Sequence, residues 1–195
     1  KGNPMLAEHK LDLPAQSIET ADPARKAVLE KAFAQVGFIP NMYALMVNSP
    51  GLLNTYLDGY AAFRKDSGFT GPEQETVFLV ISRENGCEYC MGAHSMIAEK
   101  MSGLAADSLA AIRSGAPIPD AKLAALAAFT STMVNKRGLP SKEAVAAFHA
   151  AGYTDRHILE IVLALSVKTL SNYANHLFHT QLDPMFEGHR WTCGA

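Results

Sequence analysis

The stretch "GFTGPEQETVFLVISRENGCEYC", residues 68–90, contains the signals for two successive helices. Thr70 and Glu73 form a capping-box pair directly before an apolar run, which predicts a helix that starts there. Gly86 ends this helix, and a second helix is predicted from Cys87 to Met101. Because only a glycine turn separates them, we expect the two helices to fold back on each other as an antiparallel hairpin.

The rest of the chain continues as capped helical segments. Asp22-Pro23 and Ser49-Pro50 each place proline at a first helical position, and the two helices that begin there end at glycine. Further helices are predicted over Leu104–Ser114, Asp120–Lys136, Ser141–Ala151 and Thr154–Leu182. Since no segment alternates apolar and polar residues long enough for a sheet, the sequence predicts an all-α fold, as one domain over residues 1–195.

Composition narrows the classes of function. The chain has 195 residues, of which 48% are hydrophobic and 18% charged, which is typical of a globular domain with a full core. A formal net charge of −2 without a basic cluster argues against a nucleic-acid partner. No apolar run is long enough to span a bilayer, and the start lacks the apolar stretch of a signal peptide, so we expect a cytoplasmic protein. Three cysteines do not make a secreted disulfide framework.

Two segments of the sequence resemble each other. Residues 68–94 align with residues 152–178, with several identities and with apolar positions that coincide. We interpret this similarity as an internally duplicated helical hairpin, packed as two pseudo-symmetric halves of one domain. Ser171 and Ala174 stand where the first segment has its cysteines, so only the first segment is expected to carry chemistry.

The three residues Cys87, Cys90 and His94 have a spacing that puts them on one face of a helix, within an arc of about 60°. Cys90 and His94 are one turn apart, which allows a contact between thiol and imidazole. Cys87 is expected at the helix start, where free N–H groups favour a thiolate. In an antiparallel hairpin, Glu75 comes within about a turn of His94. A thiol, a base and a carboxylate that orients the base are the parts of an activated nucleophile.

Other chemistries compete for the same residues. Zinc would need a fourth ligand, which only the distant Cys193 offers, and haem attachment would need histidine where Met91 stands. Two buried, inert cysteines are the plain structural alternative. A redox thiol pair accounts best for the pattern, and it requires neither a metal nor an organic cofactor. Cys193 is expected to be a free thiol without a role.

A second group of polar residues lies near the end of the last predicted helix. His176, His179 and Asp183 could share one helical face. We expect this face to be solvated or to lie in a contact between subunits.

The order Glu75, eleven residues, Cys87-x-x-Cys90, three residues and His94 resembles the motif of the alkylhydroperoxidase AhpD-like, carboxymuconolactone decarboxylase superfamily, in its peroxidase-related branch. The likeness extends to "NYANH" and "LD" within residues 172–183. It implies an all-α, multi-helix AhpD-like fold and homo-oligomers, commonly trimers or hexamers. It also implies reduction of a hydroperoxide substrate by a dithiol cycle, with an external dithiol as the reductant.

The resemblance assigns a role to each motif residue. Cys90 is the thiol that attacks the peroxide, Cys87 resolves it as a disulfide, His94 moves the proton, and Glu75 is the partner of His94. The best-known AhpD proteins have histidine directly before the second cysteine, where this chain has Tyr89, so a shorter or differently routed proton relay is expected. The alternatives are a carboxymuconolactone decarboxylase-like lyase, against which the two cysteines argue, and a non-enzymatic, redox-switched helical scaffold.

Overall fold

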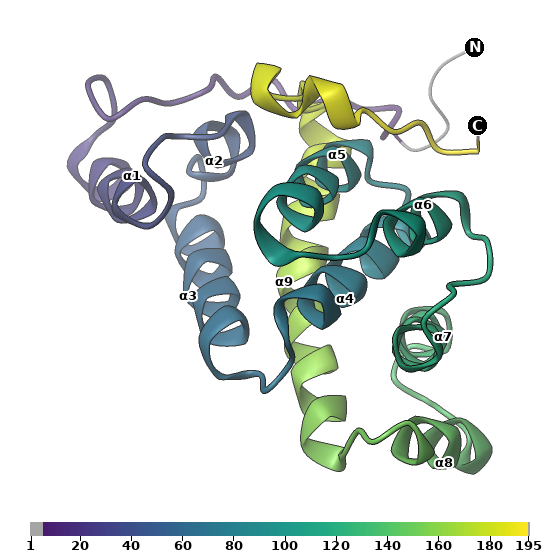
Figure 1. Ribbon diagram of the computed structural model, residues 1–195. Coiled ribbons are helices and arrows are strands. Elements are labelled where there is room, and N and C mark those ends of the chain that lie inside the picture. Colours follow the sequence, from purple (N-terminus) through teal and green to yellow (C-terminus); the bar gives the residue numbers. More distant parts are fainter. Residues whose placement is uncertain (1–5, 195) are drawn as a thin grey trace.

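The computed structural model describes residues 6–194, which form helices and no strand (Figure 1). The α-helices are α1 (Pro23–Val36), α2 (Asn41–Met46), α3 (Pro50–Asp66), α4 (Gly71–Glu84), α5 (Glu88–Ile97), α6 (Ala106–Ser114), α7 (Ala121–Asn135), α8 (Lys142–Ala150) and α9 (Asp155–Phe178). A π-helical turn, Ala98–Ser102, continues α5, and a 3-10 helix, Pro184–His189, follows α9. The all-α prediction is confirmed. None of the helices described is long and apolar enough to cross a membrane.

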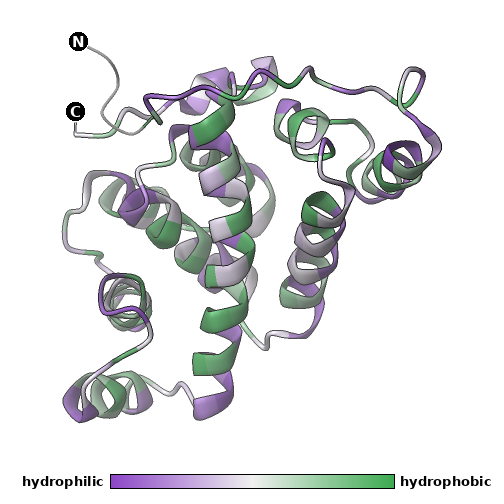
Figure 2. Cartoon of the chain, turned by 180° about the vertical axis from the view of Figure 1, so that it is seen from behind, coloured by the Kyte–Doolittle hydropathy of each residue, from purple (hydrophilic) through white to green (hydrophobic). Residues whose placement is uncertain are grey.

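Helix α4 forms the centre of the molecule. It packs against α5, α6, α7 and α9, and every residue from Glu73 to Ser82 is buried. Figure 1 shows α4 crossing the long α9, with α1 to α3 on one side and α7 and α8 on the other. From behind, α9 lies in front along most of its length and shows apolar as well as polar colour (Figure 2). Side chains that α4 turns toward α5 and α9 are therefore shielded from water.

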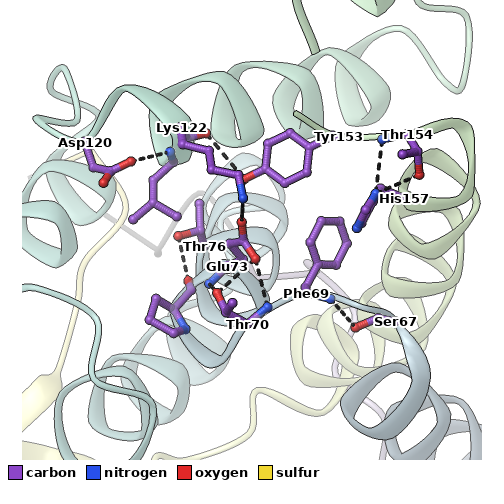
Figure 3. Close-up of polar contacts among 12 residues, drawn as sticks. Ser67, Phe69, Thr70, Glu73, Thr76, Asp120, Lys122, Tyr153, Thr154 and His157 are labelled. Carbon is purple, nitrogen blue, oxygen red and sulfur yellow. Dashed lines mark hydrogen bonds and ion pairs between the residues drawn. The ribbon is translucent and has the colours of Figure 1, made fainter. Parts of the chain in front are cut away.

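The starts of α4 and α9 are built alike. Thr70 and Glu73 cap α4 through reciprocal hydrogen bonds, and Thr154 and His157 cap α9 at the corresponding positions. Glu73 also accepts a hydrogen bond of 3.0 Å from the Tyr153 hydroxyl and pairs with Lys122 at 2.9 Å (Figure 3). These contacts fix both helix starts against α7, which positions the rest of α4.

The resemblance between the two segments ends beyond these caps. Gly86 adopts a left-handed backbone, with φ 65°, and breaks the first segment into α4 and α5. Leu170 occupies the equivalent place in the second segment, and α9 runs through it without interruption. The prediction of a second hairpin is therefore wrong, because that segment lacks the glycine at which the chain could turn.

Two short elements were not predicted. Helix α2 has six residues, and the 3-10 helix after α9 also has six, too few to show a helical period in the sequence. The last long helix ends at Phe178 rather than at Leu182, because His179 takes a left-handed conformation with φ 52°. The chain that follows folds back over α5, and this return places Asp183 beside the thiol-bearing helix.

Candidate active site

Two cysteines lie at the beginning of α5, where the chain leaves the Gly86 turn. Cys87 is the N-cap residue, and its backbone N–H donates to the Ser82 carbonyl at 2.9 Å. Cys90 lies in the first turn of the helix. Both are free thiols, exposed by only 1% and 2%. Cys193 is a third free thiol, partly exposed, and its backbone N–H donates to Glu88 at 3.2 Å.

The surroundings give the two thiols opposite acidities. Burial raises the pKa of Cys87 well above the ordinary value, and the charge and hydrogen bond of Cys90 raise it further. Burial acts in the same direction on Cys90, but a hydrogen bond from Cys87 and the positive charge of Lys168 outweigh it. The pKa of Cys90 consequently lies well below its ordinary value. Cys90 is therefore the more acidic thiol of the pair, and the hydrogen bond from Cys87 favours its thiolate form.

Glu75 of α4 holds His94 of α5 from the side. The carboxylate Oε2 is 2.8 Å from His94 Nδ1, and the other oxygen is 2.5 Å from a guanidinium nitrogen of Arg64 on α3. Burial opposes the charge on Glu75, but His94 and Arg64 outweigh it and keep its pKa below the usual range. Burial, with the charge of Lys168, lowers the pKa of His94. A neutral imidazole that donates from Nδ1 to a carboxylate keeps Nε2 free to accept a proton.

Lys168 is a charged residue of α9 in an unusual place. Its side chain is fully buried, its Nζ has no hydrogen-bond partner among the described residues, and it lies 5.5 Å from the centre of the Phe78 ring. A buried, unpaired ammonium is unfavourable for stability. It lines the same cavity as Cys90 and His94, where a positive charge favours the thiolate.

Two further polar residues of α9 reach the sulfurs. The Asn175 side-chain amide donates to Cys87 at 3.6 Å and to Cys90 at 3.5 Å. The Cys90 thiol lies 3.8 Å from the Ser171 hydroxyl. Together with Lys168 they recur on one face of α9. Ser171, at the position equivalent to Cys87, therefore lies against Cys90, so the second segment contributes side chains to the surroundings of the thiols.

A cavity of about 520 Å³ opens onto Cys90 and His94. Its wall is mainly apolar and aromatic, and its principal rings and apolar side chains are Phe38, Met42, Tyr43, Tyr56, Tyr60, Met96 and Phe186. Two basic side chains, Lys168 and Arg64, line it together with the titratable His94. An enclosure of this size and lining suits an organic molecule with a bulky apolar part.

Tyr89 stands where the resemblance to AhpD proteins implies a histidine, and its hydroxyl has a hydrogen-bond partner. Its hydroxyl donates to Asp183 at 2.5 Å, and Asp183 also accepts from the Asn41 backbone N–H at 3.1 Å. Asp183 is buried, so the expectation of a solvated face is wrong for it. His179 Nε2 donates to the Ala7 carbonyl at 2.8 Å. Asp183 lies beyond the end of α9, and the return of the chain brings it inward toward Tyr89. The helical face predicted from the sequence does not account for this return.

The sequence thus identified four residues that the structure brings together: Glu75, Cys87, Cys90 and His94. It missed Arg64, Lys168, Ser171 and Asn175. A signal for three of them exists, because Lys168, Ser171 and Asn175 interrupt the otherwise apolar buried face of α9 at helical spacing. Arg64 carries no such signal. Residues 6–194 contain no group of three or more His, Cys, Asp or Glu side chains arranged to hold a metal ion.

Comparison with known proteins relates this site to a family. Residues 50–131, which include Glu75, both motif cysteines and His94, match the carboxymuconolactone decarboxylase family. No curated protein sequence matches the chain.

Solved structures share the fold over nearly the whole length. The alkylhydroperoxidase AhpD core of an uncharacterized peroxidase-related protein from Ralstonia eutropha JMP134 superimposes with a TM-score of 0.76 at 20% identity, covering 89% of this chain and 93% of that chain. A peroxidase-related protein from Silicibacter sp. TM1040 gives 0.70 at 22% identity, covering 94% and 97%. The debrominase Bmp8, solved with 2,3,4-tribromopyrrole, gives 0.73 at 16% identity, covering 93% and 96%. The family match over residues 50–131 and these shared folds agree with the resemblance to the AhpD-like, carboxymuconolactone decarboxylase superfamily that the motif indicates.

Proposed function

We propose that this protein is a thiol-dependent peroxidase that reduces organic hydroperoxides through a Cys87–Cys90 dithiol–disulfide cycle. The observation that carries the proposal is the position of Cys90. The pKa of its thiol is lowered, it lines the large cavity, and a second thiol and a carboxylate-bound histidine lie in the same site. These are the groups that a peroxide-reducing thiol requires.

In the first step, the Cys90 thiolate attacks the terminal oxygen of the hydroperoxide. The O–O bond breaks, Cys90 becomes a sulfenic acid, and the leaving alkoxide takes up the proton that Cys90 gave to His94. In the second step, the Cys87 sulfur attacks Cys90, the S–S bond forms, and hydroxide leaves as water with the Cys87 proton. An external dithiol then reduces the disulfide. We extend the proposal to a homo-oligomer that needs no metal or organic cofactor.

The size of the cavity favours an organic oxidant. Hydrogen peroxide has four atoms, and a cavity of about 520 Å³ with an aromatic wall is far larger than it needs. The debrominase with this fold binds a halogenated pyrrole, and a cavity of aromatic lining over a thiolate could accept such a ring here. Reductive dehalogenation by the same thiol pair is therefore the second candidate function.

Three single variants test the proposal. Cys90→Ser should abolish peroxide consumption, whereas Cys87→Ser should still form a sulfenic acid once but not turn over. Cys193→Ser is the matched control and should keep full activity. The assay measures consumption of cumene hydroperoxide with dithiothreitol, alongside bromide release from a brominated pyrrole and decarboxylation of a lactone acid. Activity with the lactone acid that survives Cys90→Ser would replace our proposal with a lyase.

A further inference from the structure

The two sulfurs of the thiol pair face two different openings. Cys90 lines the cavity of about 520 Å³, and Cys87 lines a second, smaller one of about 100 Å³ on the side of the last turn of α9. Tyr89, between the cysteines, is the one residue that lines both. We infer that the smaller opening, which we call the Cys87 port, admits the reducing thiol, while the oxidant enters on the Cys90 side. This inference rests on the proposed disulfide cycle.

The chemistry of disulfide exchange requires such an arrangement. The incoming thiolate must attack one sulfur from the side opposite the sulfur that leaves. Attack on Cys87 from its port forms a bond between the reductant and Cys87, breaks the Cys87–Cys90 bond, and leaves the electron pair on Cys90. The second thiol of the reductant then attacks its own bound sulfur, releases Cys87 as a thiol, and departs as an oxidised disulfide. Cys90 is the better leaving group, because its thiolate is the stabilised one.

His176 supplies a proton acceptor in this port. It follows Asn175, which touches both sulfurs, and its Nε2 is buried without a hydrogen-bond partner among residues 6–194. Burial lowers the pKa of His176, against the smaller opposing effects of Cys90 and the Gly86 backbone. A neutral imidazole beside Cys87 can take the proton from a thiol that enters, and so form the attacking thiolate in place.

The dimensions of the port select the kind of reductant. Cys87 is only 1% exposed, and the port is about a fifth of the volume of the Cys90 cavity. The segment around Ala7 crosses the rim of the port. There the Ala7 backbone N–H donates to the His176 carbonyl, and the Ala7 carbonyl accepts from the His179 side chain. A port this narrow fits a small thiol compound, and not a cysteine held on the surface of a folded protein.

The port is tested by filling it. Thr180 lines the port but not the Cys90 cavity, so Thr180→Phe should obstruct the port. The matched control is Thr169→Phe, at an exposed position of α9 that lines a different groove, which contains neither thiol. Each protein is oxidised chemically with diamide, so the test does not depend on peroxidase activity. Reduction by dithiothreitol is then followed by stopped-flow fluorescence of Trp191, the single tryptophan, which lines the port.

We expect Thr180→Phe to slow reduction by about 10-fold or more, with the rate of oxidation by cumene hydroperoxide unchanged, and Thr169→Phe to alter neither. Reduced thioredoxin should reduce the wild-type disulfide far more slowly than dithiothreitol at equal thiol concentration. Unchanged reduction in Thr180→Phe, or thioredoxin as fast as dithiothreitol, would overturn the port. A wild-type protein that forms no Cys87–Cys90 disulfide with diamide would instead overturn the proposed function.

His176→Gln gives a second test that does not rely on bulk. Reduction by dithiothreitol at pH 7 should slow by about 10²-fold, the lower end of the range for general-base catalysis. Above the pKa of the reductant, the incoming thiol is already ionised and the difference should vanish. A loss that persists at high pH would show that His176 acts only in packing, and would remove it from the port chemistry.

Discussion

Glu75 Oε2 lies 2.8 Å from His94 Nδ1, and both side chains are shielded from solvent, with exposures of 0% and 5%. The contact joins the middle of α4 to α5 across the Gly86 turn, so the hairpin itself sets the distance. Arg64 holds the second carboxylate oxygen from α3 and prevents the carboxylate from rotating away. The histidine beside the thiolate therefore has one orientation, which the three helices determine together.

We predict that Glu75 and His94 behave as one unit. His94→Ala should slow the oxidation of Cys90 by about 10²–10⁴-fold, the usual effect of removing a proton shuttle. Adding Glu75→Gln should then slow it little further, because Glu75 acts only by orienting the imidazole. Stopped-flow oxidation of the two single variants and the double variant measures the coupling.

The matched control is Glu84→Gln. Glu84 is a carboxylate of the same helix that bonds Arg83, Ser131 and Asn135 rather than the thiol site, so its loss should leave the oxidation rate unchanged. Losses from Glu75→Gln and His94→Ala that simply multiply would show that the carboxylate acts independently of the imidazole.

Lys168 is expected to lower the pKa of Cys90 at a cost in the stability of the fold. In Lys168→Met the Cys90 pKa should rise, because the positive charge that favours the thiolate is gone. The free energy of unfolding should stay equal or increase by about 1–4 kcal/mol, since the variant replaces the buried charges of Lys168 and the Cys90 thiolate by uncharged groups of similar size. Iodoacetamide alkylation against pH and urea unfolding measure the two effects. Lys142→Met, at an exposed position of α8, should change neither. Loss of stability in Lys168→Met would mean that the attraction between ammonium and thiolate exceeds the cost of burying the two charges.

The Tyr89 hydroxyl is expected to contribute to stability. In Tyr89→Phe, Asp183 loses the donor at 2.5 Å and keeps the Asn41 backbone N–H. A buried carboxylate that loses one partner should lower the free energy of unfolding by about 1–3 kcal/mol. Tyr173→Phe is the control, because Tyr173 is 55% exposed. Equal stability of both variants in urea unfolding would argue that water replaces the lost donor.

The sequence predicts most of the helices because several of them, such as α1, α4 and α8, begin at a capping residue and end near a glycine. The Thr70–Glu73 and Asp22–Pro23 starts are local, and the structure confirms them within one or two residues. The hairpin of α4 and α5, which carries Glu75, Cys87, Cys90 and His94, is predictable for the same reason, because the turn is at Gly86.

The residues that the sequence did not reveal reach the site from outside the hairpin. Arg64 and Lys168 lie on α3 and α9, and only tertiary packing brings them to Glu75 and Cys90. The position of Arg64 in the sequence gives no sign of this, whereas Lys168 gives one only by interrupting an apolar helical face. The predicted last helix extends to Leu182, which suggests a shared helical face for Asp183. In the structure the left-handed His179 ends α9 at Phe178 and redirects the chain toward Tyr89.

Acidification is predicted to destabilise the protein through the same pair. The pKa of His94 in the folded chain is lowered from its ordinary value of 6.5. As the pH falls below 6.5, the unfolded chain therefore binds a proton at His94 before the folded chain does. The folded pKa of Glu75 is lowered from 4.5, so below that pH the unfolded carboxylate is protonated first. In both cases the unfolded state binds more protons, and stability falls as pH falls.

Urea unfolding at a series of pH values from 8 to 4 tests the sign. The free energy of unfolding should be constant above pH 7 and decline through the range in which His94 titrates in the unfolded chain, then decline further below pH 4.5. His94→Gln should reduce the slope between pH 7 and 5, because the group that differs between the two states is gone. It should also reduce the decline below pH 4.5, because His94 helps to lower the pKa of Glu75, and Arg64 should maintain the remainder. A slope of the opposite sign between pH 7 and 5 in the wild-type protein would mean that the folded state holds His94 protonated, paired as a cation with Glu75. In that case His94 could not accept the proton of Cys90 at neutral pH, and it would act as a fixed positive charge beside the thiolate.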